Sequence, residues 1–549
     1  MDDTRRQAFA LAEPADLPRR SEIGYRWLVV ALIALHAVLA WHRRAPSITT
    51  GNDDTTYILL ARSLLHFGYN DTFLIGAPLH SQYPPGYPLL LAMLSAVFGE
   101  RVSVFVTVNV MLSATALATF YWMARRRWPA DICVLALAVA AVNPSLIYSA
   151  GRVASEPMYM ALTMLALYFL TVTPASARSM ALGTAAIVGA SLTRSIGVTL
   201  LAALGLLWLL ERRYKQVLAL GAASGLTIGA WLLWTIRAPQ KVVGRSYIAD
   251  FTYQGGSAPS LFRVLADRLV DNAQDYFARS LPWILPWPTI AGTVVDNALW
   301  LLLDMGLGAL GIWLLWNRHR VVALAVVSYC ALLAIWPWPV GRFLFPMLPL
   351  IILALVIGAA WLAARLRARA FQYLPAVLGA LIIVTAIFRN ADLMSDSIAC
   401  DRSRPLTSPG CFNADQRALF AAADFAKRKL PPSAGVLVAK EAPFAYLSGL
   451  QTFPFLIALR ADSARYHEFL LENGIQYVLL GNMVKNLEPA VGQKLMGLCS
   501  HLELTAEFPP RTNLLRVYRE AAPDGGAAAC AAIRRTLASG EYELPTVRY

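Results

Sequence analysis

The sequence predicts a polytopic α-helical membrane protein of about eleven transmembrane helices, with a C-terminal, outward-facing α/β soluble domain. Its 549 residues are 57% hydrophobic and only 15% charged, whereas soluble domains contain about 25% charged residues. Many apolar stretches are long enough to cross a hydrocarbon core of about 30 Å. Residues 390–549 differ, because acids and bases there are interspersed among short apolar runs.

Short clusters of Lys and Arg separate many of the predicted transmembrane helices. Eleven crossings place every strong cluster between spans on one side of the membrane, as the positive-inside rule requires of cytoplasmic loops. The net charge of +14 therefore reflects membrane topology, and we expect no nucleic-acid partner. The predicted spans are 25–42, 102–123, 131–149, 155–173, 179–192, 197–211, 216–236, 296–316, 321–338, 342–364 and 371–388.

This topology divides the chain into three parts. Residues 1–24 are a cytoplasmic tail, and residues 25–389 form the transmembrane domain, with two long outer loops at 43–101 and 237–295. Residues 390–549 follow the last crossing and are expected on the outer side.

The outward segment reads as a small α/β domain. Residues 413–430 have the pattern of an amphipathic helix, and residues 435–439 and 476–480 read as short buried strands. An even number of cysteines in an oxidising compartment predicts one or two disulfides, with Cys400–Cys411 the nearer pair; the alternative is that all stay reduced. The cysteines of this segment are Cys400, Cys411, Cys499 and Cys530.

The first outer loop contains two adjacent acids, Asp53 and Asp54, in 51-GNDDTTYILLARSLLHFGYN-70. They open a candidate amphipathic helix along the membrane plane, with Tyr57 one turn from Asp53. Two neighbouring carboxylates near lipid ionise together only if a cation or hydrogen-bond donors compensate them. One acid could then serve as a general base, while the other binds a cation or orients a sugar hydroxyl. The alternative is a helix cap, since Asp is favoured in the first turn.

A third acid, Glu156 in 155-SEPMY-159, opens the fourth predicted span at its outer end. It is either a first-turn cap or a site residue. Arg194 and Arg342 stand at outer span ends, against the positive-inside bias, and guanidinium is a natural partner for phosphate. Snorkelling to lipid headgroups is the alternative. The predicted spans before and after Arg194 are short, so the boundary 191–194 could lie below the membrane surface. An irregular backbone there is tolerated only beside a protein-lined cavity.

Other residues could contribute to such a site. His80, Gln82 and Tyr83 precede a Pro-Pro turn and could face the same cavity, although a lone loop histidine is usually solvated. Arg245 adds a further cation in the second outer loop. Asp304 lies within the eighth predicted span, and an acid at that depth is a functional candidate by default. No Cys/His spacing predicts a zinc site.

Taken in order, these motifs resemble those of one superfamily. The series is an acid pair with Tyr and Ala at helical spacing, a Pro-Pro turn, Ser-Glu opening a span, Thr-Arg, and Arg-aromatic-x-x-Pro-x-x-Pro. It resembles the GT-C integral-membrane glycosyltransferases that use lipid-phosphate sugars, close to the protein O-mannosyltransferase and aminoarabinose transferase group. The resemblance covers residues 25–390.

The resemblance implies an inverting transfer of a sugar from a polyprenyl phosphate carrier to a hydroxyl acceptor, which is a glycan, lipid or protein. It implies a location in the inner membrane, among membrane lipids, with the active site on the outer face. Asp53 matches the presumed base, Asp54 the second acid, and Glu156 the acid of the Ser-Glu turn. A divalent cation is left open, and no metal ligands are assigned. The expected substrate-binding residues are Tyr57, His80, Gln82, Tyr83, Arg194, Arg245 and Arg342.

The motifs leave two questions open. The run 83-YPPGYP-88 departs from the Lys-Pro-Pro run of the aminoarabinose transferases, so neither the sugar nor the acceptor is defined. A lipid or glycan transporter, or flippase, is the competing class, but it predicts repeated halves and discontinuous helices at mid-membrane. No repeated halves are found in the sequence.

Overall fold

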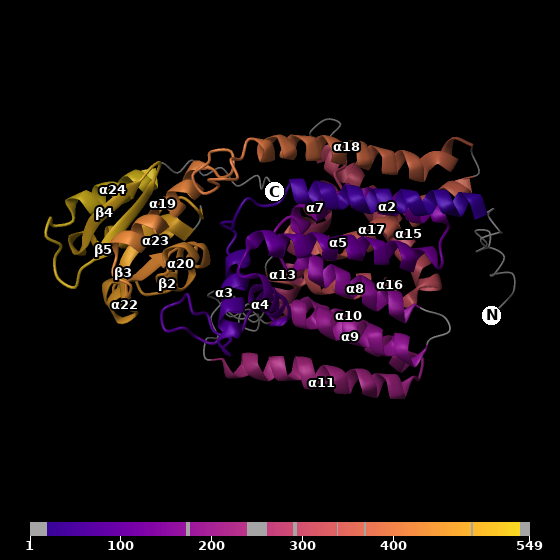
Figure 1. The fold of residues 1–549 in the computed structure, drawn as a ribbon, viewed down its shortest axis with the longest axis horizontal. Coiled ribbons are helices and arrows are strands. Elements are labelled where there is room, and N and C mark those ends of the chain that lie inside the picture. The colour runs from indigo at the N-terminus through magenta and orange to yellow at the C-terminus, as the bar shows by residue number, and fades with distance from the viewer. Residues whose placement is uncertain are drawn as a thin grey trace.

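The fold has two parts, a bundle of long helices and a smaller α/β domain at one end of it (Figure 1). The computed structural model describes residues 19–171, 176–238, 261–288, 294–337, 339–366, 369–484 and 487–538. Arg245 and most of the second predicted outer loop lie outside the described residues.

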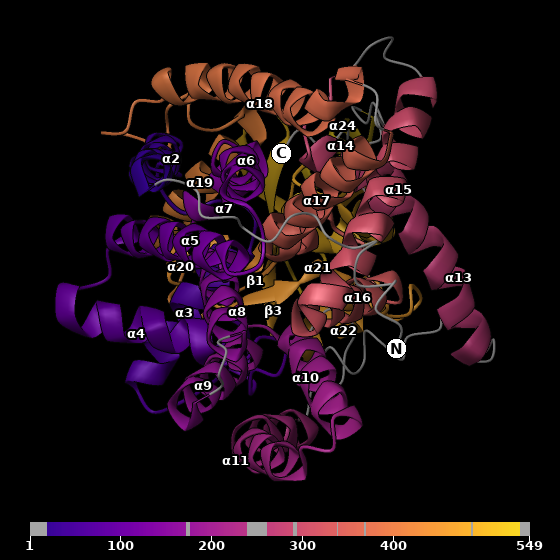
Figure 2. The ribbon, with the colours of Figure 1, turned by 90° about the vertical axis from the view of Figure 1, so that its right-hand side faces the viewer.

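The bundle begins with α2 and ends with α18, and two groups of helices meet within it. On one side α5 packs on α8 and α8 on α9, while on the other α15 packs on α17, and contacts between α6 and α17 join the two (Figure 2). The helices are α2 (Arg19–His42), α3 (Asp53–Leu65), α4 (Gly86–Phe98), α5 (Val102–Arg125), α6 (Ala130–Ala141), α7 (Pro144–Ala150), α8 (Glu156–Leu170), α9 (Ala177–Thr193), η1 (Ser195–Gly197), α10 (Val198–Leu210), α11 (Tyr214–Arg237), α13 (Leu261–Ala273), η2 (Gln274–Ser280), α14 (Leu281–Ile284), α15 (Val294–Arg318), α16 (Arg320–Ala334), η3 (Gly341–Met347), α17 (Leu348–Leu366), η4 (Arg369–Tyr373) and α18 (Leu374–Ile398).

Each predicted span coincides with a helix or with helices joined in series, and the chain is a multi-pass membrane protein. Among the described residues, six helices are long and apolar enough to cross a membrane, or seven if α6 and α7 form one span bent by 61°. The helices α8, α10 and α16 are apolar but shorter. The count of eleven crossings therefore stays a prediction.

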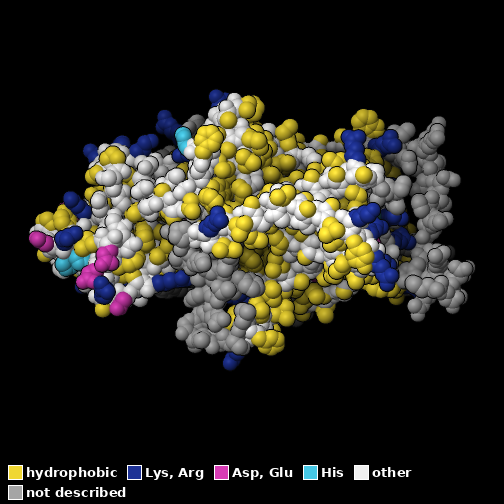
Figure 3. All heavy atoms as spheres, turned by 90° about the horizontal axis from the view of Figure 1, so that it is seen from below, with side chains coloured by type: hydrophobic (Ala, Val, Ile, Leu, Met, Phe, Trp, Pro, Cys, Tyr) yellow, Lys and Arg dark blue, Asp and Glu magenta, His cyan; other side chains and the backbone are white. Residues whose placement is uncertain are grey.

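The surface of the bundle is rich in hydrophobic side chains, and Lys and Arg side chains gather near its end away from the α/β domain; others lie over the α/β domain itself (Figure 3). Acidic side chains in this view lie over the α/β domain. The apolar surface fits lipid contact, and the basic end fits the cytoplasmic side expected from the sequence.

The helix α3 differs from its prediction. An interfacial helix should keep one face exposed, but every residue from Asp54 to Ala61 is buried. The cause is its position between the bundle and the α/β domain, where Leu59 packs with Ala442 and Ala445. The helix α4 begins at Gly86, directly after the Pro-Pro turn, and is too short to cross a membrane.

The α/β domain is built on a five-stranded mixed sheet with strand order β2-β1-β3-β5-β4. The strand β1 pairs in parallel with β2 and β3, and β5 pairs antiparallel with β3 and β4. Helix α19, β1 and β3 confirm the sequence prediction, whereas β2, β4 and β5 were not predicted. The elements are α19 (Ala414–Lys429), β1 (Gly435–Val438), α20 (Glu441–Ser448), β2 (Thr452–Pro454), α21 (Phe455–Ala458), α22 (Tyr466–Glu472), β3 (Ile475–Leu480), α23 (Leu487–Met496), η5 (Cys499–His501), β4 (Leu502–Phe508), β5 (Thr512–Val517) and α24 (Ala527–Ala538).

Two disulfides stabilise this domain. The predicted Cys400–Cys411 bond is present, and a second joins Cys499 to Cys530. Both fit the oxidising side expected from the topology.

Candidate active site

A cavity of about 220 Å³ opens where the start of α3 faces the ends of several bundle helices. Five segments of the chain line it: the start of α3, the Pro-Pro turn, the α9–η1 junction, the end of α16 and η3. The lining residues are Asp53, Tyr57, Gln82, Tyr83, Pro84, Thr193, Arg194, Ser195, Ile196, Tyr329, Leu333, Trp336, Val340, Arg342 and Phe343.

Asp53 is the acid that faces this cavity. Its Oδ2 accepts a hydrogen bond from Arg342 Nη2 and its Oδ1 accepts one from the Tyr83 hydroxyl at 2.9 Å. Burial acts to raise the pKa of Asp53, but the Arg342 charge, the hydrogen bonds from Tyr83 and Arg342, and the more distant Arg194 outweigh it, so this pKa lies below its ordinary value of 3.8. Asp53 is therefore ionised at neutral pH.

A second ion pair stands beside the first. Arg194 Nη1 lies 2.8 Å from Glu156 Oε1, and both side chains are largely buried. The same nitrogen donates to Ser155 Oγ at 2.8 Å, and that hydroxyl is 3.0 Å from the Tyr57 hydroxyl. Ser155 occupies the N-cap position of α8 without a capping hydrogen bond. Both residues of the Ser-Glu turn therefore belong to the site network rather than acting only as a cap.

Close backbone packing brings these distant segments together. A Cβ on Gly86, at the start of α4, would lie 2.7 Å from the carbonyl oxygen of Leu192 near the end of α9. A Cβ on Gly197 would lie 2.6 Å from Ser191 Cα, where the chain turns from α9 through η1 into α10. Neither position has room for a side chain. The Pro-Pro turn and Arg194 thus reach the same cavity. The helix α9 stays regular to Thr193, and the backbone departs from it at Arg194, which is extended and leads into η1.

Asp54 points elsewhere. Its Oδ2 accepts from the Thr49 N–H at 2.5 Å and its Oδ1 from the Thr55 N–H at 2.9 Å, and it does not line the cavity. Burial raises its pKa above the ordinary 3.8, although these N–H donors act against the rise. Asp54 thus fixes the loop that enters α3, which is the capping alternative, whereas Asp53 holds the site position.

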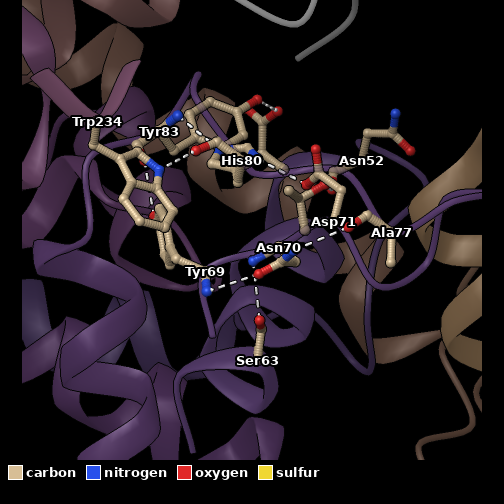
Figure 4. Close-up of polar contacts among 11 residues, drawn as sticks. Asn52, Ser63, Tyr69, Asn70, Asp71, Ala77, His80, Tyr83 and Trp234 are labelled. Atoms are coloured by element: carbon tan, nitrogen blue, oxygen red, sulfur yellow. Dashed lines mark hydrogen bonds and ion pairs between the residues drawn. The ribbon is translucent and has the colours of Figure 1, made fainter. Parts of the chain in front are cut away.

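The three candidate residues before the Pro-Pro turn also differ in whether they line the cavity. Gln82 and Tyr83 line the cavity with Tyr57, as expected for substrate-binding residues. His80 does not line the cavity; it is buried and contacts Asp71 and the backbone of Tyr83 (Figure 4). Arg245 lies outside the described residues, so its role stays a prediction.

Asp304 is remote from the cavity. It is buried in α15, where its Oδ1 accepts a hydrogen bond from Trp287 Nε1 at 3.0 Å. Trp287 stacks on Trp300 with the ring centroids 4.7 Å apart. The structure thus supplies the partner that the sequence did not, an indole rather than a cation.

Several lining residues were not predicted. Tyr329, Leu333, Trp336 and Phe343 enter the cavity from the predicted spans 321–338 and 342–364. Their composition carries no signal that separates cavity-facing from lipid-facing positions. Ser155 could have been found, because a hydroxyl before an acid at a span end is a plausible hydrogen-bond partner.

The site is organised by guanidinium groups. Among the described residues, no group of three or more His, Cys, Asp or Glu side chains has the arrangement of a metal site. Asp53 lines the cavity and contacts Arg342, whereas Glu156 does not line it and contacts Arg194, which does. Arg342 Nε is buried and has no hydrogen-bond partner among the described residues, so the group retains donor capacity.

No protein-family model and no curated protein matches this chain, but solved structures do. ArnT from Cupriavidus metallidurans bound to undecaprenyl phosphate matches 91% of this chain and 99% of its own, with 16% identity and a TM-score of 0.53. The apo oligosaccharyltransferase of Archaeoglobus fulgidus matches 85% of this chain and 71% of its own, with 14% identity and a TM-score of 0.53. AglB from the same organism, in complex with an inhibitory peptide and a dolichol-phosphate, matches 83% and 69%, with 13% identity and a TM-score of 0.51.

The chain therefore has the fold of GT-C membrane glycosyltransferases. At these identities the match concerns the fold, and it confirms the fold that the ordered motifs implied. The similarity extends over almost the whole length of ArnT, including the region after the bundle.

Proposed function

We propose that this protein is an inverting glycosyltransferase that moves a sugar from a polyprenyl phosphate to a hydroxyl acceptor at the outer face of the inner membrane. The proposal rests on one observation. An ionised acid, Asp53, is hydrogen-bonded to Arg342 in a cavity next to the Glu156–Arg194 pair. This transfer requires a carboxylate that accepts a proton and guanidinium groups that stabilise the negative charge of the phosphate.

The reaction is a single displacement. The acceptor oxygen attacks the anomeric carbon from the side opposite the phosphate, and its proton passes to the Asp53 carboxylate. The bond between that carbon and the phosphate oxygen breaks, and its electron pair leaves on the phosphate. Arg194 and Arg342 stabilise the added negative charge, and the configuration at the anomeric carbon inverts.

Donor binding would also activate the base. A carboxylate held by a guanidinium is a weak base, because the pair lowers its pKa. A phosphate that engages Arg342 competes with Asp53 for the same donors, and this competition raises the basicity of the carboxylate when the donor is present. Arg342 Nε has no hydrogen-bond partner among the described residues, so the guanidinium has donor capacity beyond its bond to Asp53.

The donor class is supported by two of the matched structures. ArnT is described with undecaprenyl phosphate, and AglB with a dolichol-phosphate. The cavity also brings aromatic side chains, including Tyr57, Trp336 and Phe343, beside the charged groups. Such a mixture suits a sugar ring next to a phosphate.

The direct test is turnover by the purified protein in nanodiscs. Undecaprenyl-phosphate-linked hexose, N-acetylhexosamine, pentose and aminopentose are supplied in turn with an extract of envelope lipids and glycans. Mass spectrometry follows release of undecaprenyl phosphate. We expect release with one donor class, dependent on acceptor and inverted at the new bond.

Asp424→Asn is the matched control for acid variants in this assay, because Asp424 is an exposed residue of α19, remote from the cavity. No release with any donor and acceptor combination would contradict the proposal. Movement of intact donor between leaflets of a vesicle, with no bond cleavage, would instead support a transporter.

A further inference from the structure

Behind Tyr83 lies a polar network that the proposed reaction does not use. Residues 69–80 form a hairpin, here called the 69–80 hairpin (Figure 4). Within it the Asp71 N–H donates to the Pro78 oxygen at 2.8 Å, and the His80 N–H donates to the Tyr69 oxygen at 2.9 Å. The Asn70 side chain adds a bond to the Ala77 oxygen at 3.0 Å. The two legs are therefore fixed to each other.

The base of the hairpin holds both backbone groups of Tyr83. Its N–H donates to His80 Nε2 at 2.8 Å, and its carbonyl oxygen accepts from the Tyr69 hydroxyl at 2.8 Å. Since Nε2 accepts, the imidazole proton is on Nδ1, which donates to Asp71 Oδ1 at 2.7 Å. His80 and Asp71 are both buried. Trp234 of α11 adds a hydrogen bond to the His80 oxygen at 2.9 Å.

The tip of the same hairpin is attached to the α/β domain. The Ile75 N–H donates to the Thr452 oxygen at 3.0 Å, and the Thr452 N–H donates to the Phe73 oxygen at 2.8 Å. Leu74 forms a parallel bridge to Thr452, so the tip extends the sheet beyond its edge strand β2. Such edge pairing recruits main-chain hydrogen bonds and fixes register.

Side chains reinforce this attachment. Phe73 and Leu74 are buried against Ala442 and Ala445 of α20. Ile75 packs against the core of the α/β domain. The tip of the hairpin is therefore held by the α/β domain. Its base is hydrogen-bonded to Tyr83, whose hydroxyl contacts Asp53.

We propose that the 69–80 hairpin is a strap through which the α/β domain positions the Tyr83 hydroxyl on Asp53, with His80 as the positioning residue at its base. The catalytic part of this inference rests on the proposed function, whereas the mechanical part does not. In this proposal the α/β domain influences the site, although none of its residues lines the cavity.

Hydrogen–deuterium exchange of the full-length protein in nanodiscs tests the mechanical part. Ile75→Ala removes the side chain that anchors the tip, and Thr72→Ala, at an exposed position of the same hairpin, is the matched control. His80→Phe keeps a ring against Tyr83 but removes the acceptor for its N–H. We expect exchange at the Tyr83 amide to rise about fivefold to tenfold in both Ile75→Ala and His80→Phe, the size of one lost hydrogen bond.

Protection of β1 and β3 reports whether each variant keeps its fold. If His80→Phe loses that protection, His80→Gln takes its place, because its amide oxygen can still accept from the Tyr83 N–H. The strap then predicts slower exchange at the Tyr83 amide in His80→Gln than in Ile75→Ala, and exchange as fast in His80→Gln as in Ile75→Ala would overturn the role of His80. Faster exchange confined to residues 73–75 in Ile75→Ala, with Tyr83 unchanged, would overturn the proposal.

Turnover of the donor accepted by the wild type tests the catalytic part. We expect Ile75→Ala to lower kcat about tenfold while KM for that donor changes less than about threefold, since the strap aligns the base rather than the carrier. Unchanged kcat with faster exchange at Tyr83 would overturn the positioning role. If the wild type transfers no sugar but Tyr83 still responds to Ile75→Ala, the strap is supported and the proposed function fails.

Discussion

Asp53 and Asp54 are adjacent in the first turn of α3, but their carboxylates lie in different surroundings. Asp53 faces a cavity and contacts Arg342 and Tyr83, whereas Asp54 is enclosed by the loop N–H groups of Thr49 and Thr55. Their pKa values consequently shift in opposite directions. A charge partner and an open cavity, rather than acidity or burial, therefore distinguish the candidate base Asp53 from its neighbour Asp54.

The largest expected effect is that of Asp53→Asn. The amide cannot take the acceptor proton, so we expect turnover to fall on the order of 10²- to 10⁴-fold, the usual contribution of a general base. Release of undecaprenyl phosphate by purified enzyme measures it, with protein amount and thermal stability as controls. A larger loss of turnover in Asp54→Asn than in Asp53→Asn would make Asp54, and not Asp53, the candidate base.

Glu156→Gln should have the next largest effect. It leaves Arg194 in a largely buried position without its carboxylate, and the guanidinium is then free to shift toward the donor phosphate. We expect kcat/KM to fall about tenfold to a hundredfold, with KM for the donor lowered or unchanged. A donor titration separates these quantities, and unchanged kcat/KM would remove this pair from the site.

Gly86→Ala tests whether the Pro-Pro turn must approach α9 as closely as it does. The added Cβ would press on the Leu192 carbonyl, so we expect about 1–3 kcal/mol of destabilisation and weaker turnover as Tyr83 shifts. Gly205→Ala in α10 is the matched control, because its Cβ meets only an ordinary contact 3.8 Å away. Thermal unfolding in nanodiscs measures both variants, and equal stability would contradict the account.

The smallest effect concerns Asp54 and pH. Its folded pKa is raised, so the native state binds the proton more tightly than the unfolded state, and its contribution to stability grows as pH falls through the folded pKa toward 3.8. Asp53 has the opposite sign, because its lowered pKa contributes stability that is lost as pH falls below 3.8.

We therefore expect Asp54→Asn to lose stability relative to the wild type as pH falls from 7 to 4, with turnover at pH 7 within about threefold of normal, because Asp54 does not line the cavity. Melting temperatures at several pH values measure this difference. A constant difference across that range would show that Asp54 keeps its ordinary pKa.

Much of the bundle could be predicted from sequence, because apolar length and basic clusters leave strong local signals. The span 102–123 lies within α5, and the Cys400–Cys411 bond was expected from its short separation. The strand β4 was missed although 502-LELTAEF-508 alternates apolar and polar residues, so that signal was available. Weak strands next to longer helical patterns are easily overlooked.

The site was less predictable, since its geometry depends on contacts between distant segments. The acids and arginines were identified by residue type at span ends, but nothing local separates Asp53 from Asp54. The difference comes from Arg342, which lies 289 residues away in the chain and donates a hydrogen bond to Asp53. The position of His80 likewise follows from the hairpin and not from its own neighbours in the chain.

A structure of the protein with undecaprenyl phosphate bound would show whether Arg194 and Arg342 hold the phosphate beside Asp53. We predict the phosphate in the cavity between Arg194 and Arg342, with the Asp53 carboxylate released from Arg342 and facing the space left for an acceptor. A carrier bound outside the cavity, with the Asp53–Arg342 pair intact, would contradict the claim.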